Sequence, residues 1–134
     1  YLFKPNLKEI REGLASEVNP KSLESLSNID SELRKLLNHT WSLITLSEYG
    51  MFASNGTEHV QIASRPVTIS DVSGAGDTVI STAALCLASG ADIQLSIFLA
   101  NLAGGSVCEK PGVVPVDATT LFTDAIAELK KLPE

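Results

Sequence analysis

The chain has 134 residues, of which 44% are hydrophobic, and a formal net charge of −6 with ten Lys and Arg residues. This length suffices for one modest core, and the acidic balance excludes the basic surface expected of a nucleic-acid-binding protein. No segment approaches the ~20 apolar residues of a membrane span, and the start lacks the charged region of a signal peptide. We therefore expect a soluble, cytoplasmic chain without a nucleic-acid or membrane partner.

The first predicted elements alternate between strand and helix. Tyr1–Phe3 is typical of the end of a strand, and Asn6 followed by Glu9 is typical of a capping box that opens a helix. Asn19-Pro20 predicts the cap and first residue of a second helical region. The apolar spacing of that region is helical, but a polar segment at 27–30 predicts an interruption.

Three short strands are predicted next, at residues 41–46, 51–54 and 58–63. Asn55-Gly56 joins the last two, and this dipeptide predicts a hairpin with a type I′ turn.

The second half of the chain is predicted to be mainly helical. A helix rich in small apolar residues is expected from about Thr78 to Ser89, with Gly90 at its end. Asp92 is expected to cap another helix that reaches toward Val107.

The C-terminal segment predicts one edge strand and one helix. Residues 113–116 are the expected strand, and Asp117 is expected to cap the helix. The side chains expected to face the core from this helix are Leu121, Phe122, Ala125, Ile126 and Leu129. Strands that alternate with helices in this way predict an α/β fold.

The segment Asp71-Val-Ser-Gly-Ala-Gly-Asp77 carries the strongest functional signal. Gly74 and Gly76 let the backbone approach a ligand closely, and the first N–H groups of the following helix are unpaired at its positive end. An anion is expected to bind there. Asp77 lies within this anion site, where a carboxylate can accept the proton of an attacking hydroxyl group. The segment therefore predicts phosphoryl transfer, and the alternative is an ordinary strand-to-helix turn.

Two common glycine motifs are excluded. A Walker A loop needs a lysine directly after its last glycine, but no lysine or arginine follows Gly74 until Lys110. The dinucleotide-binding fingerprint fails because Val79 occupies the position of its third glycine.

The remaining pattern, Asp-x-[Ser/Thr]-Gly-Ala-Gly-Asp-Thr, resembles the second signature of the ribokinase-like (PfkB) carbohydrate kinases. The segments that carry the resemblance are Lys4–Glu9, Ile44–Met51, Asp71–Ile80 and Leu99–Val107. Ser-Glu-x-Gly-Met and Gly-Ala-Gly-Asp-Thr-Val-Ile are most similar to the kinase domain of D-glycero-D-manno-heptose 7-phosphate kinases. The resemblance implies a three-layer α/β/α fold, of which residues 1–134 form the C-terminal part. The N-terminal sugar-binding half would be absent, and the incomplete sheet favours a homo-oligomer.

The resemblance also implies ATP and Mg²⁺ as cofactors and a small sugar or sugar phosphate as substrate. Asp77 would be the catalytic base, and the backbone of Gly74, Ala75 and Gly76 would form the anion hole. Glu9 would organise Mg²⁺ through water, whereas its alternative role is purely that of a helix cap. The residues that would border the nucleotide are Asn6, Thr45, Ser47, Glu48, Gly50, Gly74, Gly76, Asn101 and Gly105.

Two further interpretations depend on the same resemblance. A K⁺ site would consist of Asp71, Ser73, Val107, Lys110 and Gly112. The Gly104-Gly105 pair would leave room for the purine, although close packing against another helix would explain two adjacent glycines equally well.

The preferred substrate is heptose 7-phosphate, which would give the 1,7-bisphosphate for lipopolysaccharide synthesis. Ribose, fructose, adenosine or another small hydroxyl compound remains open. This chain alone is expected to be inactive. The alternatives from other classes are a non-catalytic nucleotide-binding module and a structural α/β subunit with an exposed sheet edge.

Overall fold

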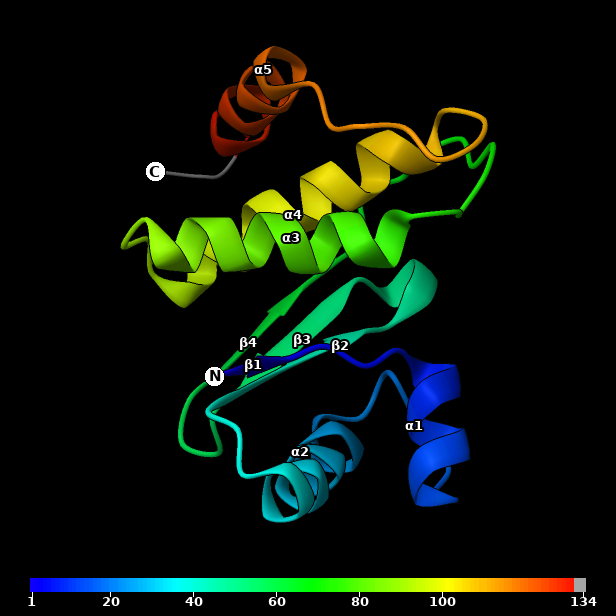
Figure 1. Cartoon of the computed structure of the whole chain (residues 1–134), viewed down its shortest axis with the longest axis vertical. Helices are drawn as coiled ribbons and strands as arrows, with labels where there is room; N and C mark the ends of the chain where they lie inside the picture. Colours follow the sequence, from blue (N-terminus) through cyan, green and yellow to red (C-terminus); the bar gives the residue numbers. More distant parts are fainter. Residues whose placement is uncertain (132–134) are drawn as a thin grey trace. The chain divides into compact units, whose positions relative to one another are not determined.

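The computed structural model describes residues 1–131, which belong to two compact units, Tyr1–Ser64 and the chain from Arg65 onward (Figure 1). The first unit contains a four-stranded sheet in the order β1-β2-β3-β4. Its strands are β1 Leu2–Phe3, β2 Trp41–Thr45, β3 Met51–Ser54 and β4 His59–Ile62. β1 runs parallel to β2, whereas the pairs β2–β3 and β3–β4 are antiparallel.

Helices α1 (Leu7–Leu14) and α2 (Leu23–Leu37) cover one face of this sheet (Figure 1). The buried side chains that form the core between helices and sheet are Ile10, Val18, Leu26, Ile29, Leu33, Ile44, Leu46 and Phe52. The predicted α1 and its capping box are confirmed, as is the strand at Tyr1–Phe3, of which Leu2–Phe3 pair with β2.

The predicted start and interruption of α2 are both wrong. The N-cap is Ser22, whose hydroxyl accepts a hydrogen bond from Ser25 N at 3.2 Å. Asn19 instead accepts one from Lys21 N at 3.0 Å, so its side chain stabilises a turn before the helix. The helix continues through residues 27–30 because Ile29 and Asp30 are buried, and tertiary packing overrides the polar local sequence.

The hairpin of β3 and β4 is confirmed, but its type I′ turn is wrong. A type I′ turn requires positive φ at both central residues, whereas of Asn55 and Gly56 only Gly56 has one, at 88°. The connection has four residues, because Ser54 pairs with His59. Asn55 Oδ1 accepts hydrogen bonds from Thr57 N at 3.0 Å and Glu58 N at 2.8 Å, and this side-chain capping stabilises the longer loop.

The unit from Arg65 onward contains α3 Ala75–Ala88, α4 Ile93–Cys108 and α5 Ala118–Leu129. α3 packs along α4, and α5 also contacts α4 (Figure 1). α3 begins three residues before the predicted Thr78, so Asp77 lies inside its first turn. Within residues 1–131, no helix has the length and apolar character needed to cross a bilayer.

The predicted helix boundaries at Gly90, Asp92 and Asp117 are confirmed. Gly90 has a φ of 87°, and the next residue, Ala91, donates its N–H to Cys86 O at 3.0 Å. These contacts form the Schellman motif that ends many helices. Asp92 accepts a hydrogen bond from Leu95 N at 2.8 Å, and Asp117 accepts one from Thr120 N at 2.7 Å.

The predicted edge strand at 113–116 is wrong. The segment has no strand geometry, Pro115 has no N–H to donate, and the described part of this unit contains no strand with which it could pair. The predicted inner face of α5 is also partly wrong, because Phe122 is 69% exposed whereas Ala125 is 6% exposed.

The partly buried side chain of His39 makes the stability of the first unit depend on pH. Its Nε2 shares a 2.7 Å hydrogen bond with Ser42 Oγ. Burial is the main influence and lowers the pKa of His39 below its ordinary value of 6.5; Asp30 raises this pKa, and Arg34 lowers it. Since the folded state disfavours the protonated ring, the stabilisation is complete above the unfolded pKa of ~6.5 and is lost as the pH falls from there through the lower pKa of the folded state.

We therefore expect the free energy of unfolding to decrease between about pH 7.5 and about pH 5 more steeply in the wild type than in His39→Gln. Urea unfolding at both pH values measures this difference. Equal slopes for the wild type and His39→Gln would contradict the prediction.

Candidate functional site

The loop before α3 prepares unpaired backbone donors at the helix N-terminus. Gly74 is the N-cap with a φ of 76°, and it has no side chain that could cap the helix. Ala75 N donates to Val72 O at 3.2 Å and Thr78 N donates to Gly74 O at 2.9 Å. Within the described residues, the N–H groups of Gly76 and Asp77 have no such backbone or cap acceptor. These two donors lie at the positive end of α3 and suit a phosphate oxygen.

The positive φ of Gly74 favours glycine, because a side chain is strained in that conformation. A Cβ on Gly74 would also lie 3.1 Å from Val113 Cγ1, so the exposed Val113 side chain would have to shift slightly. Val113 thus lies beside the turn although it is outside the motif. Sequence reasoning missed this contact, because no local pattern joins residues so far apart in the chain.

Asp77 is exposed on the first turn of α3, beside a groove of about 460 Å³. Gly74, Asp77, Thr78 and Ser81 contribute polar groups to this groove, whereas its apolar wall includes Leu85, Val113, Val116 and Leu121. The carboxylate of Asp77 is thus accessible to a second molecule, next to the unpaired donors. This arrangement places a carboxylate and unpaired backbone donors within one helical turn.

Asp71 joins the loop before α3 to the loop that follows α4. Its Oδ1 accepts a hydrogen bond from Ser73 N at 2.9 Å, and its Oδ2 accepts one from Gly112 N at 3.0 Å. The hydrogen bonds from Ser73, followed by that from Gly112, hold the pKa of Asp71 below its ordinary value of 3.8. Asp71 is therefore charged at neutral pH and connects the two loops.

The structure brings together only some of the predicted K⁺ ligands. Asp71, Ser73 and Gly112 are joined by the hydrogen bonds of Asp71. Val107 O accepts the N–H of Lys110 at 3.1 Å, which engages that carbonyl in the helix end. The carbonyl that contacts this loop is Cys108 O, to which Ser70 N and Asp71 N donate at 2.8 and 3.2 Å. Cys108 left no signal in the sequence, because its carbonyl and not its side chain makes the contact.

In the first unit, Asn6 and Glu9 form a complete capping box. Asn6 N donates to Glu9 Oε2 and Glu9 N donates to Asn6 Oδ1, both at 2.8 Å. The structural role of Glu9 is therefore confirmed. Glu9 is exposed, so the same carboxylate still faces solvent, and its role toward Mg²⁺ stays a prediction. Within residues 1–131, no cluster of His, Cys, Asp and Glu side chains could hold a metal ion by itself.

The predicted nucleotide residues of the first unit meet at the end of β2. Thr45 forms a parallel bridge with Asn6, and Thr45 N donates to Pro5 O at 3.1 Å. A short 3₁₀ helix, Ser47–Tyr49, follows and contains the exposed Glu48. Gly50 closes this turn with a φ of 88°, and its carbonyl accepts Leu46 N at 2.8 Å.

The two glycines of α4 have different environments. A Cβ on Gly104 would lie 2.8 Å from Val79 Cγ2 in α3, so close helix packing explains this glycine. A Cβ on Gly105 would make only an ordinary 3.7 Å contact with Val67 Cγ1. Gly105 and the half-buried Asn101 in the same helix therefore remain predicted neighbours of the nucleotide.

Comparison with known proteins gives one family match and several similar sequences. A profile described as pfkB family carbohydrate kinase matches residues 1–120. The Bifunctional protein HldE of Campylobacter concisus is 38% identical over 123 residues, which cover 92% of this chain and 25% of that protein. The protein of the same name from Koribacter versatilis is 37% identical over 126 residues, which cover 94% of this chain and 26% of that protein. The chain thus spans about a quarter of the length of these relatives.

Solved structures confirm the expected ribokinase-like α/β fold. Arabidopsis thaliana ribokinase complexed with ribose and ATP superposes with a TM-score of 0.83 at 20% identity, over 92% of this chain and 40% of that one. Escherichia coli phosphofructokinase-2 in complex with potassium superposes with a TM-score of 0.80 at 20% identity, and the superposition covers 97% of this chain and 41% of that one. At this level of identity the likeness concerns the fold alone.

Proposed function

Since the chain belongs to the pfkB family of carbohydrate kinases, we propose that it carries the nucleotide-binding and catalytic-base part of an ATP-dependent sugar kinase. The observation that carries this proposal is the first turn of α3. There, the unpaired N–H groups of Gly76 and Asp77 lie beside the exposed carboxylate of Asp77. An anion site next to a proton acceptor is the minimum that phosphoryl transfer to a hydroxyl group requires.

In the proposed reaction, Asp77 orients the acceptor hydroxyl and accepts its proton. The hydroxyl oxygen forms a bond with the γ-phosphorus while the bond to the β-phosphate oxygen breaks and ADP leaves. The N–H groups of Gly76 and Asp77, on the turn fixed by Gly74, stabilise the charge on the transferred group. When bound, Mg²⁺ neutralises phosphate charge. Glu9 would hold a water of its shell, and Asp71 with Gly112 would border a K⁺ ion.

The proposed acceptor is D-glycero-D-manno-heptose 7-phosphate, which would give the 1,7-bisphosphate for lipopolysaccharide synthesis. Its support is the resemblance of Ser47–Met51 and Gly74–Ile80 to heptose kinases, together with relatives that share the name HldE. A cytoplasmic location and a homo-oligomer belong to the same proposal.

The test uses the chain alone and the chain joined to the remaining part of the kinase domain of the Campylobacter concisus relative, here called the complemented kinase. We expect the chain alone to bind ATP with Mg²⁺ without turnover, because it spans about a quarter of its relatives' length and we propose that the groups that hold a sugar against Asp77 lie in the part it does not cover. The complemented kinase should release ADP with heptose 7-phosphate faster than with ribose, fructose or adenosine.

Other outcomes separate the alternatives. ATP binding without turnover of any sugar by the complemented kinase would favour a non-catalytic nucleotide-binding module. Self-association in sedimentation experiments without ATP binding would favour a structural subunit. Faster turnover of a different sugar would overturn the substrate and leave the reaction type intact.

Replacement of Glu9 separates its capping role from its proposed metal role. We expect Glu9→Gln to raise the Mg²⁺ concentration for half-maximal activity of the complemented kinase severalfold, because the charge that attracts the hydrated ion is lost. Stability should change by less than ~0.5 kcal/mol, since glutamine also completes a capping box. Mg²⁺ titration of activity and urea unfolding measure the two effects.

Glu12→Gln is the matched control, because Glu12 is an exposed glutamate of the same helix. Its Oε1 lies 3.8 Å from Lys8 Nζ, so this carboxylate is charged and already has a neighbour on the helix surface. Glu12→Gln should leave the Mg²⁺ requirement unchanged. A loss of ~1 kcal/mol in Glu9→Gln with an unchanged Mg²⁺ requirement would assign Glu9 to the cap alone.

A further inference from the structure

The side chain of Arg65 connects three segments within the unit from Arg65 onward. Its Nη1 donates a hydrogen bond to Asp124 Oδ2 of α5 at 3.1 Å, and its Nη2 donates one to Glu109 Oε2 at 3.3 Å. The Arg65 side chain is 24% exposed, so both ion pairs are partly shielded from water. A guanidinium group suits two carboxylates because its donors form a rigid planar fork. No sequence motif pointed to these contacts, since the partners are 44 and 59 residues away.

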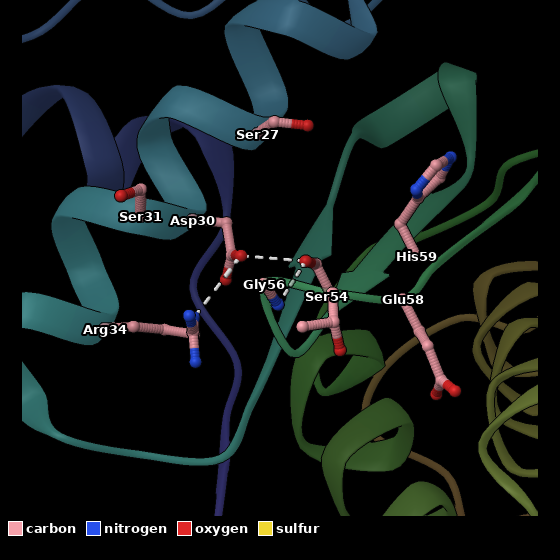
Figure 2. A pocket seen from close by; sticks show the side chains of 9 residues that line it. Ser27, Asp30, Ser31, Arg34, Ser54, Gly56, Glu58 and His59 are labelled. Atoms are coloured by element: carbon pink, nitrogen blue, oxygen red, sulfur yellow. Dashed lines mark hydrogen bonds and ion pairs between the residues drawn. The ribbon is translucent and has the colours of Figure 1, made fainter.

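Arg34 of the first unit shows a different arrangement. Its Nε lies 3.5 Å from Asp30 Oδ2, and both residues belong to α2, four residues apart (Figure 2). An ion pair of this spacing joins groups on one face of a single helix. Arg65 instead joins a loop to two helices, so its loss affects how separate segments are held together.

The contact with Glu109 compensates for an unfavourable charge at the end of α4. Glu109 is the C-cap of this helix, and the last helical turn contains no basic residue. A carboxylate is unfavourable there, because the C-terminus is the negative end of the helix dipole. Arg65 brings a positive charge to this carboxylate from the loop before α3.

The same contact lies next to the carbonyl group that holds the loop before α3. Cys108 O, one residue before Glu109, accepts hydrogen bonds from Ser70 N at 2.8 Å and from Asp71 N at 3.2 Å. The loop is thus attached to the end of α4 at two places, by the side chain of Arg65 and by the backbone of Ser70 and Asp71.

The second attachment continues directly into the turn at the start of α3. Asp71 Oδ1 accepts the N–H of Ser73 at 2.9 Å, and Gly74 is the next residue and the N-cap of α3. A continuous series of contacts therefore leads from Arg65, through the end of α4, to the Gly74–Asp77 turn.

We propose that Arg65 is a positioning residue for the Gly74–Asp77 turn, and that it acts through Glu109 and the last turn of α4. Without the guanidinium, the loop is held to α4 at one place only, and the backbone donors of the turn are less ordered. Binding of a phosphate group then has to order them, which lowers the affinity. The consequence for ATP rests on the proposed kinase function, whereas the ordering of the loop does not.

The first experiment measures amide hydrogen exchange in the whole chain by NMR. Arg65→Met keeps an unbranched side chain but makes neither ion pair. It should speed exchange of the Ser70, Asp71 and Ser73 amides about fivefold, because the loop opens more often. The Ala91 amide, beyond the C-terminus of α3, is the internal reference and should keep its rate. Unchanged rates at the three loop amides, or an equal rise at Ala91, would overturn the proposal.

Replacement of each partner identifies the path. Glu109→Gln should reproduce the effect of Arg65→Met, because it removes the ion pair beside Cys108 O. It also removes the unfavourable charge at the helix end, so fraying of α4 does not explain faster exchange. Asp124→Asn should change the loop rates less than about twofold, because Asp124 connects Arg65 to α5 and not to α4. The opposite pattern would overturn the path through Glu109.

Lys131→Met is the matched control in the same unit. It removes an exposed ion pair of 2.7 Å between Lys131 and Glu128. The exchange rates of the loop amides should not change. A rise as large as that in Arg65→Met would show that any lost ion pair has this effect, and the proposal would fail.

The second experiment measures the Kd of the chain for ATP with Mg²⁺ by calorimetry. Arg65→Met and Glu109→Gln should raise this Kd about threefold or more, whereas Lys131→Met should not change it. If the wild-type chain binds no ATP, the proposed function fails, and the exchange rates still decide whether Arg65 orders the turn. Faster exchange with an unchanged Kd would limit Arg65 to a structural role and overturn the proposal.

Discussion

Asp77→Asn in the complemented kinase is expected to lower kcat by a factor of about 10²–10⁴, the range that a positioned general base contributes. The amide has nearly the same shape as the carboxylate but cannot accept the proton of the acceptor hydroxyl. The N–H groups of Gly76 and Asp77 remain, so the Kd for ATP should stay within a few-fold. ADP release under saturating substrate and calorimetric ATP titration measure the two quantities.

Asp92→Asn provides the matched control, because Asp92 also lies at the start of a helix and its side chain caps Leu95 N. Asparagine caps helices about as well as aspartate, so this variant should keep both kcat and stability. Near-normal turnover in Asp77→Asn would overturn the assignment of Asp77 as the base. An equal loss in both variants would indicate a general effect of removing a helix-capping charge.

Gly50→Ala is expected to destabilise the chain by about 3 kcal/mol or more, or to prevent folding. Gly50 is buried with a φ of 88°, where a side chain is strained. A Cβ would also overlap the carbonyl oxygen of Ile62 and lie 2.6 Å from Ser64 N. These neighbours are backbone atoms, so no side-chain rotation can relieve the overlap. Urea unfolding followed by circular dichroism measures the loss.

Gly13→Ala is the control substitution in the same unit. Gly13 lies in α1, has ordinary helical geometry, and has no neighbouring atom within 4 Å of an added Cβ. It should stabilise the chain by about 0.5–1 kcal/mol, the usual preference of a helix for alanine. A stability loss in Gly50→Ala no larger than ~0.5 kcal/mol would show that the β2–β3 turn can adopt another conformation.

The sequence by itself was sufficient for features whose partners are close in the chain. The capping box at Asn6 and the helix caps at Asp92 and Asp117 join groups three residues apart, and the Schellman motif at Gly90 joins groups within about one helical turn. Such bonds depend on local geometry, so residue type and spacing predict them. The turn at Gly74–Asp77 was predictable for the same reason, because its residues belong to the start of α3, whereas its binding of an anion stays a prediction.

Only the tertiary structure decided the features whose partners are distant in the chain. Asp30 is buried in α2 and accepts a hydrogen bond from Ser54, 24 residues later, which compensates its desolvation, and α2 continues through this locally polar segment. Asp71 meets Gly112 across 41 residues. Gly104 leaves space for Val79 of the neighbouring helix. Contacts of this kind arise from packing between elements, and neither propensity nor spacing within a short segment carries that information.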